Sequence, residues 1–329
     1  TVPYHVKRPY HISVHDIPAY KREMERQESI GVLERCWETK WGLPGFVRPK
    51  KDGTIRTIED MRELNKRVVR KVYPLPRIQD ILHRRRNYKY FTKIDISMQY
   101  YTFMLDNESS SYVIIVTPMG KWRRKRVPMG FIGSTDWAQA TMEEIFKEVL
   151  DEVELYIDDI GLFHTDWDKH VTMIDLVLTR LEENGFTVNP LKCEWGVQET
   201  DWLGHWLTPT GPKPWRKKIE PILALAPPSS LKQLRAFIGF VNFYKEYWRK
   251  RADTMAPLTS LTGLKTNKKF RQNWTHKQTT AFNAVKAMIA REVLLQYPDP
   301  NEPFDIDTDA LDYQLGAVIK QHGRPVAFF

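Results

Sequence analysis

Three aspartates stand where a divalent metal ion is expected to bind. Asp95 ends one apolar run, and the adjacent pair Asp158 and Asp159 separates two others. A carboxylate at the end of an apolar strand is costly unless a cation meets it, and two neighbouring carboxylates repel each other. Oxygen ligands of this kind suit Mg²⁺, which keeps several waters and accepts substrate phosphates. The alternative is a solvated turn, in which Asp-Asp pairs are common.

The apolar runs around these aspartates predict the elements that hold them. Residues 90–96, 153–157 and 160–163 are typical of buried strands. Two amphipathic helices lie between and after them, one with an apolar face at Ala138, Met142, Ile145, Phe146 and Val149, the other at Val171, Ile174, Leu178 and Leu181. The order strand, helix, strand, strand, helix, strand indicates a split βαβ, ferredoxin-like sheet. In such a sheet Asp95 and Asp158 would face the same cleft.

The remaining segments predict a mixture of helices and strands. Residues 17–30 and 231–241 are typical of helices, and the polar, basic residues 265–271 favour a loop. From residue 304 onward, alternating runs separated by His322-Gly323 predict a hairpin.

Composition favours a polyanionic partner. The 329 residues carry 50 Lys+Arg against 41 Asp+Glu, a net charge of +9, and include 11 Trp, 14 Tyr and 15 Phe. Cations bind phosphates and flat rings stack on bases, although a soluble protein can also simply be basic.

Two cysteines, Cys36 and Cys193, form neither a disulfide scaffold nor a structural zinc site, which favours a reducing, intracellular compartment. No apolar run approaches the roughly 20 residues needed to span a bilayer. The missing initial Met predicts a piece of a longer protein.

Several motifs occur together in one order. Tyr156-Ile157-Asp158-Asp159 is similar to the catalytic box of reverse transcriptases. Further similar segments follow the family order: 43–56, 60–65, 73–78, 91–100, 128–130, 189–193, 202–205 and 234–244. The chain therefore resembles the reverse transcriptases of gypsy-class LTR retrotransposons, which are related to retroviral ones. Residues 304–318 resemble the first strands of an RNase H domain.

The resemblance implies an α+β fold, that of a right-hand polymerase with fingers, a ferredoxin-like palm and a helical thumb, followed by a truncated RNase H-like β segment. The expected limits are fingers 1–88 with a return through 98–133, palm 89–97 and 134–208, thumb 209–262, a connection or linker 263–303, and RNase H-like strands 304–329.

The resemblance also implies RNA-directed and DNA-directed DNA polymerisation. In this chemistry a primer 3′-OH attacks the α-phosphate of a dNTP while two divalent ions stabilise the attacking and leaving oxygens. Asp95, Asp158 and Asp159 would ligate two Mg²⁺ ions, with Mn²⁺ as the alternative. Lys192 would protonate the leaving pyrophosphate.

A second group of residues is expected to bind the nucleotide. Lys50 and Arg56 fit a triphosphate clamp, because a guanidinium offers a planar fork to phosphate oxygens. Tyr100 would lie beneath the sugar and exclude a 2′-OH, and Met129 and Gly130 would line the same pocket. Gln139 completes this set.

Trp202, Leu203 and Gly204 match the primer grip. Two departures from the family pattern stand out. Gln99 replaces the usual Gly or Ala and would narrow the sugar pocket, and residues 133–137 differ from the usual Asn-Ala-Pro-Ala-Thr.

The expected partners are an RNA or DNA template with its primer and a dNTP, with no membrane; the oligomeric state stays open. A cytoplasmic location, with virus-like particles as one setting, goes with this reading. Asp309 matches the first carboxylate of RNase H, and the chain ends before the others, so RNase H activity is not expected. The alternatives are a non-catalytic nucleic-acid-binding subunit, a domesticated remnant, or another ferredoxin-like enzyme such as a nucleotide cyclase.

Overall fold

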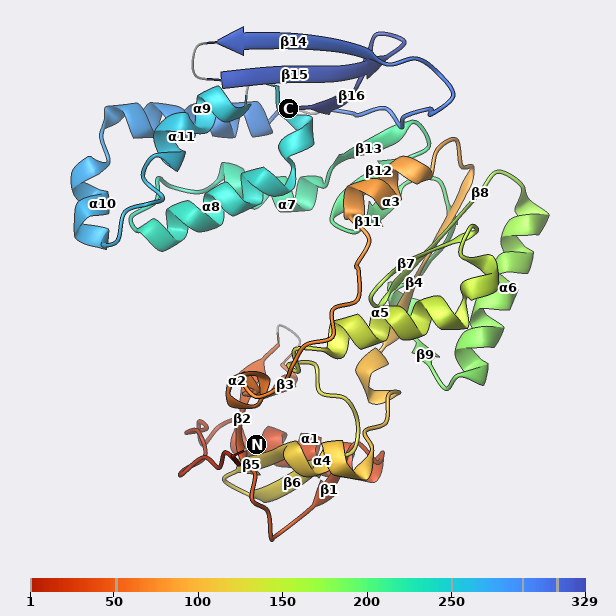
Figure 1. Ribbon diagram of the computed structural model, residues 1–329, viewed down its shortest axis with the longest axis vertical. Helices are drawn as coiled ribbons and strands as arrows, with labels where there is room; N and C mark the ends of the chain where they lie inside the picture. Colours follow the sequence, from red (N-terminus) through yellow and green to blue (C-terminus); the bar gives the residue numbers. More distant parts are fainter. Residues whose placement is uncertain (1, 51–52, 250, 292, 312–313) are drawn as a thin grey trace. The chain divides into compact units, whose positions relative to one another are not determined.

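The computed structural model describes residues 2–50, 53–249, 251–291, 293–311 and 314–329 (Figure 1). Within these ranges no helix is both long enough and apolar enough to cross a membrane. The chain divides into two compact units. The first comprises the residues up to Pro76, Lys93–Leu162 and Val171–Cys193, and the second comprises Arg77–Thr92, Phe163–His170 and Glu194–Phe329. The limits expected for fingers, palm, thumb and connection stay a prediction.

A five-stranded sheet in the order β1-β6-β5-β2-β3 forms one part of the first unit. Its strands are β1 (Leu33–Arg35), β2 (Leu43–Pro49), β3 (Ile55–Glu59), β5 (Ile114–Thr117) and β6 (Gly120–Arg124). The accompanying helices are α1 (Ile17–Ser29), α2 (Arg62–Asn65) and α4 (Asn107–Tyr112). Helix α1 was expected over 17–30 and is confirmed. Tyr20 and Met24 of α1 pack against Leu33 and Trp122 in one apolar cluster.

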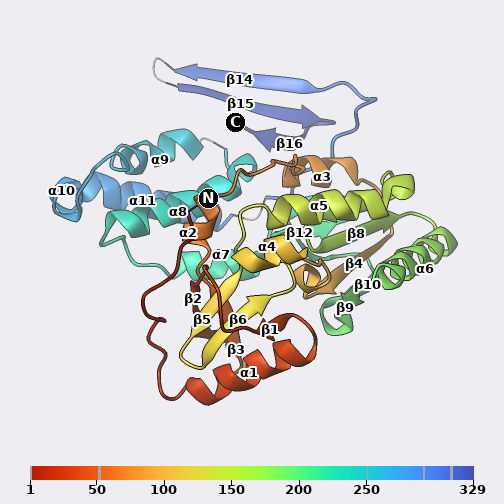
Figure 2. The same cartoon turned by 60° about the horizontal axis from the view of Figure 1, so that its bottom comes forward.

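The ferredoxin-like sheet predicted around the aspartates is confirmed (Figure 2). Its strands are β4 (Tyr90–Ser97), β7 (Val153–Tyr156), β8 (Asp159–His164), β9 (Thr187–Val188) and β10 (Glu194–Val197). The hydrogen-bonded order is β10-β4-β8-β7, and β9 also pairs with β4. The order β9-β4-β8-β7 is therefore the one that a split βαβ requires. Short helical turns η1 (Gln99–Tyr101), η2 (Lys147–Val149) and η3 (Pro190–Lys192) connect these elements.

Two helices, α5 (Ser134–Ile145) and α6 (Trp167–Glu183), cover one face of this sheet. Ala138 and Met142 of α5 and Val177 of α6 share a core with Ile94 and Ile96 of β4. Side chains alternate along a strand, so residues 93, 95 and 97 of β4 lie on the opposite face. The helical core thus explains why Asp95 is directed to the uncovered side of the sheet.

The second unit combines several helices with small antiparallel sheets. Its elements are α3 (Ile78–Arg84), β11 (Thr200–Trp202), β12 (His205–Thr208), β13 (Gly211–Pro214), α7 (Arg216–Leu223), α8 (Leu231–Phe243), η4 (Lys245–Tyr247), α9 (Arg251–Thr259), α10 (Asn267–Asn273) and α11 (His276–Ile289). Helix α8, expected over 231–241, is confirmed. The loop expected at 265–271 is wrong, because α10 occupies it. Thr266 caps α10, and its buried Phe270 packs in the same core as Phe282 of α11 and Leu234 of α8.

Three antiparallel strands end the described chain: β14 (Asp305–Leu311), β15 (Gln314–Gln321) and β16 (Arg324–Phe328). The expected turn at His322-Gly323 is confirmed, and both residues have positive φ, 50° and 72°. A two-residue turn of this kind matches the twist of the strands it joins.

Candidate active site

Asp95 lies near the end of β4, 28% exposed, with a cation beside it. The Lys192 Nζ is 3.3 Å from Asp95 Oδ1 and 3.5 Å from Oδ2. The backbone of residue 95 is held on both sides, because Asn189 N–H donates to its carbonyl at 3.0 Å and its own N–H donates to Cys193 Sγ at 3.4 Å. The predicted catalytic pair Asp95 and Lys192 is thus brought together by η3, which follows β9.

Asp158 lies in the two-residue turn between β7 and β8, where Tyr156 pairs with Asp159. The Asp158 carbonyl accepts a hydrogen bond from Ile96 N–H at 3.3 Å, so this turn lies directly beside the end of β4. Asp158 is exposed, and Asp159 begins β8. The sheet therefore places two of the three predicted metal ligands, Asp95 and Asp158, next to each other.

The first residue of this turn, Ile157, has a φ of 59°. Positive φ at the first central position is the mark of the hairpin turn that usually takes Gly there, and for a β-branched residue it is strained. Gln139, which is fully buried, holds the strained residue. Its Oε1 accepts from Ile157 N–H at 2.8 Å, and its Nε2 donates to Leu155 O at 3.1 Å and Glu143 Oε1 at 2.8 Å. Gln139 thus supports the turn that carries Asp158.

Partial desolvation of its carboxylate and, to a smaller extent, the charge of Asp95 raise the pKa of Asp158, while a backbone hydrogen bond and the charge of Lys192 lower it. The ionised form of Asp158 is therefore disfavoured by its own surroundings, which a bound cation would reverse. Among the described residues, no group of three or more His, Cys, Asp or Glu side chains is arranged to hold a metal by itself. The donor set fits Mg²⁺ whose remaining ligands are water and substrate phosphate, with Asp95 and Asp158 as the protein ligands.

Tyr100 follows β4 in the turn η1 and is half-buried against the core beneath the sheet. Burial raises the pKa of Tyr100, a hydrogen bond with Thr135 lowers it, and the charge of Asp158 raises it further. The phenol ring therefore lies close to the Asp158 turn, and its expected contact with the sugar stays a prediction.

The unusual sequence at 133–137 has a structural explanation. Asp136 in the first turn of α5 is 3% exposed and receives three hydrogen bonds. Arg70 donates two of them, at 2.6 Å and 2.9 Å, and Tyr73 N–H donates the third at 3.0 Å. The replacement therefore fastens the extended segment before α3 onto helix α5.

The β2–β3 hairpin carries the residues expected to bind the triphosphate. Arg56 and Lys50 are both exposed, and Lys50 forms the turn through backbone bonds with Thr54 and Gly53. The Lys51-Asp52 part of this motif lies outside the described residues. Sequence analysis missed Arg48, which pairs directly across the hairpin with Arg56 and is also exposed. Like charges directly opposite each other are destabilising, so this pair favours binding of an anion.

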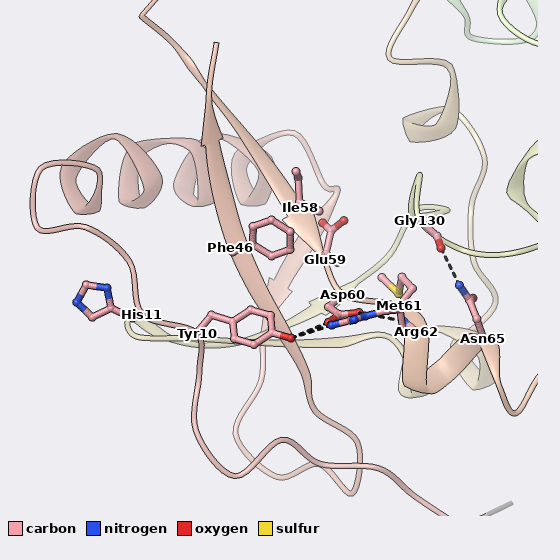
Figure 3. Close-up of a pocket in the computed structure, with 10 residues that line it drawn as sticks. All are labelled: Tyr10, His11, Phe46, Ile58, Glu59, Asp60, Met61, Arg62, Asn65 and Gly130. Carbon is pink, nitrogen blue, oxygen red and sulfur yellow. Dashed lines mark hydrogen bonds and ion pairs between the residues drawn. The ribbon is translucent and has the colours of Figure 1, made fainter. Parts of the chain in front are cut away.

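A cavity of about 640 Å³ lies beside this hairpin (Figure 3). At its wall, Tyr10 donates to Asp60 Oδ2 at 2.7 Å, and Arg62 Nη2 lies 2.6 Å from the same oxygen. The Arg62 guanidinium and the Tyr10 hydroxyl hold the pKa of Asp60 well below its usual range. Arg62 itself remains 79% exposed. The 60–65 segment, which resembles the family, thus supplies a fixed cation that faces an open cavity.

Gly130 also lines this cavity, and its carbonyl accepts a hydrogen bond from Asn65 Nδ2 at 3.0 Å. A Cβ at Gly130 would lie 3.2 Å from Met61 Cγ and 3.4 Å from Glu59 O, which is tight. Its neighbour Met129 is 52% exposed. The structure therefore links Gly130 to the β3–α2 segment, and the sugar-pocket role of both residues stays a prediction.

The predicted primer-grip residues lie in the second unit, at the β11–β12 turn. Leu203 and Gly204 have positive φ values of 46° and 85°. Tyr244 of α8 donates its hydroxyl to the Gly204 carbonyl at 2.6 Å, which fastens the turn. Trp202 is 2% exposed and contacts the Phe91 and Phe163 rings, so it acts as a core aromatic that anchors the hairpin.

Comparisons with known proteins agree with this architecture. Residues 48–207 match the family described as reverse transcriptase (RNA-dependent DNA polymerase), and residues 274–329 match the RNase H-like domain found in reverse transcriptase. The chain is 33% identical over 302 residues to the Pol polyprotein of transposon 297 from Drosophila melanogaster, covering 90% of this chain and 28% of that protein. For the gypsy Pol polyprotein of the same organism, identity is 28% over 299 residues, covering 87% and 28%.

Solved structures show the same fold. The foamy viral protease-reverse transcriptase dRH in complex with double-stranded DNA has a TM-score of 0.90 at 23% identity, covering all of this chain and 58% of that one. The foamy viral enzyme in complex with an RNA/DNA hybrid gives 0.86 at 22%, covering 100% and 44%. The predicted right-hand polymerase fold is therefore confirmed. The chain spans less than a third of the length of the two Drosophila relatives named above. By its sequence matches and its fold, the chain contains a reverse transcriptase domain over residues 48–207 and an RNase H-like segment over residues 274–329, and its homologues are retrotransposon Pol polyproteins.

Proposed function

We propose that this chain extends a primer with dNTPs on an RNA or DNA template. The observation that carries the proposal is the juxtaposition of Asp95 and Asp158, with the Asp158 carbonyl bonded to Ile96 N–H at 3.3 Å. Two neighbouring carboxylates on the uncovered face of a ferredoxin-like sheet, of which Asp158 has a raised pKa, are suited to hold cations. The complexes of the foamy viral relatives with double-stranded DNA and an RNA/DNA hybrid support nucleic-acid partners.

Each group on the chain has a task in this reaction. Asp95 and Asp158 bind the metal ions, and Asp159 completes the carboxylate set. Bound Mg²⁺ supplies Lewis-acid stabilisation of the attacking and leaving oxygens. Lys192 neutralises Asp95 at 3.3 Å before substrate enters and, once the metal takes over that charge, is available to give a proton to pyrophosphate.

Arg48, Lys50 and Arg56 on the β2–β3 hairpin meet the triphosphate, because guanidinium forks bind phosphate oxygens bidentately and the Lys50 ammonium adds a further positive charge. Arg62, fixed by Asp60 at one wall of the cavity in Figure 3, is a further exposed cation suited to bind a phosphate group of the substrate. A retrotransposon enzyme of this kind would work in the cytoplasm, where virus-like particles are one setting.

Primer extension tests the proposal. The purified chain is incubated with Mg²⁺, the four dNTPs and a labelled primer on an RNA template, with a DNA template in parallel. We expect template-directed, full-length products on both, and no product without template or after chelation of Mg²⁺. Tight primer–template binding without any extension would instead support a non-catalytic, nucleic-acid-binding subunit.

A further inference from the structure

The turn that carries Asp158 is held from two sides by buried amide side chains. Ile157, with its φ of 59°, is the strained residue of this turn. Gln139 Oε1 accepts from Ile157 N–H at 2.8 Å. On the other side Gln99 Nε2 donates to Ile157 O at 2.9 Å. Both peptide groups that flank the Ile157 Cα are therefore fixed by side chains from other elements.

Gln99 comes from the part of the chain that carries Asp95. It is the first residue of η1, and only Met98, which has a φ of 50°, separates it from the end of β4. Its side chain is 2% exposed, so its amide does not reach solvent. The bond to Ile157 therefore ties the β4 end, with Asp95, directly to the turn that carries Asp158.

The unpaired oxygen of the Gln99 amide supports a specific role for its donor group. The Gln99 Oε1 is buried and has no hydrogen-bond partner among the described residues. A buried, unpaired acceptor is unfavourable, and a Gly or Ala, which the family usually has here, would avoid it. The structure keeps this unfavourable oxygen together with the hydrogen bond from Gln99 Nε2 to the Ile157 carbonyl.

We propose that Gln99 is a positioning residue for polymerisation, which sets the placement of Asp158 relative to Asp95 by holding the Ile157 carbonyl. The inference rests on the proposed function. If the Ile157 peptide is released, the turn can relax from its strained conformation and displace Asp158. Displacements of about 1 Å near reacting groups can lower rates by about 100-fold. This role differs from the expectation that Gln99 narrows the sugar pocket.

The test replaces Gln99 by Met, which keeps length and bulk but removes the donor, and separately by Ala. Single-turnover incorporation of one dNTP on a primed template gives the maximal rate and the apparent dNTP affinity. Hydrogen exchange of peptides covering residues 153–163 reports on the turn without requiring activity. We expect the maximal rate to fall about tenfold or more in both variants, the dNTP affinity to stay within about threefold, and the turn amides to exchange faster.

Gln27→Met is the matched control. Gln27 is a buried glutamine on α1, 1% exposed, that bonds Glu23 and Thr57 far along the sequence from the turn. The Gln27→Met variant should lose about as much folding stability as the Gln99 variants. It should nevertheless keep the wild-type maximal rate and the wild-type hydrogen exchange of residues 153–163. An unchanged rate and unchanged exchange in the Gln99 variants would overturn the inference. So would a change confined to dNTP affinity, which would return Gln99 to the sugar pocket. An inactive wild type would contradict the proposed function instead, while the exchange result would still test the bond.

Discussion

At the residue scale, the proposed active site depends on a few residues whose backbone conformation or ionisation is unfavourable by itself. Ile157 has a φ of 59°, and the pKa of Asp158 is raised by partial desolvation and by the charge of Asp95. Backbone strain and perturbed pKa values concentrate at functional sites because the surrounding structure maintains them for a purpose. In the proposed function, they hold two carboxylates in position for cations and substrate.

Tyr100 should govern sugar selection, since its ring lies near the Asp158 turn and is half-buried. Replacing Tyr100 by Ala removes the ring that would clash with a ribose 2′-OH. We expect the ratio of kcat/KM for dNTP over rNTP to fall about 100-fold or more, mainly through faster rNTP incorporation.

Tyr100→Phe is the control for this experiment, because it keeps the ring and loses only the hydroxyl. It should retain most of the discrimination. If the ratio in Tyr100→Ala equals the wild-type ratio while both rates drop, Tyr100 is a core aromatic and the sugar gate lies elsewhere.

At the element scale, strand register decides which side chains act together. The β2–β3 pairing sets Arg48 directly opposite Arg56. Neither guanidinium has an acidic partner within ion-pair distance among the described residues. The hairpin therefore presents concentrated positive charge on an exposed element, as a triphosphate site requires.

Arg48→Gln and Arg56→Gln should each raise the KM for dNTP by about tenfold, because each removes a charge-assisted bond to phosphate, with a smaller effect on kcat. Steady-state kinetics on a primed template measures both constants. Arg22→Gln, an exposed arginine on α1, should leave them unchanged. Arg48→Gln kinetics matching those of Arg22→Gln would remove Arg48 from the triphosphate site.

The sequence predicted the elements whose apolar residues repeat regularly. Helices α5, α6 and α8 and the strands around Asp95 and Asp158 each bury a periodic face, so their types followed from the pattern. Helix α10 was missed because it is short and polar and buries a single anchor, Phe270. One capping residue and one buried ring do not form a repeating apolar pattern from which a helix could be predicted.

Contacts between distant segments were outside the reach of sequence patterns. The bond from Gln99 to Ile157 spans 58 residues, and Asp136 meets Arg70 across 66. Arg48 gains significance only from the β2–β3 register. The aspartates, by contrast, were predictable, because carboxylates next to apolar strands stand out without knowledge of their partners.

At the scale of the whole molecule, the three aspartates, Lys192, Tyr100, Gln99 and Gln139 all belong to the first compact unit. The predicted primer-grip turn belongs to the second. The proposed chemical site is thus contained in one unit, and we expect a single conservative substitution there to separate chemistry from nucleic-acid binding. The net charge of +9 favours binding of the polyanionic substrate independently of that site.

The most direct test of the account is single-turnover incorporation of one dNTP by Asp158→Asn on a primed RNA template with Mg²⁺. An amide ligates Mg²⁺ poorly, so the rate should fall more than about 100-fold, about 3 kcal/mol in the barrier. Primer–template affinity should stay within a few-fold of wild type. Without Mg²⁺, the melting temperature should stay equal or rise, because a carboxyl with a raised pKa is disfavoured when ionised in the folded state. Asp175→Asn, an exposed aspartate on α6, should behave as wild type. An incorporation rate for Asp158→Asn within a few-fold of wild type would contradict the account.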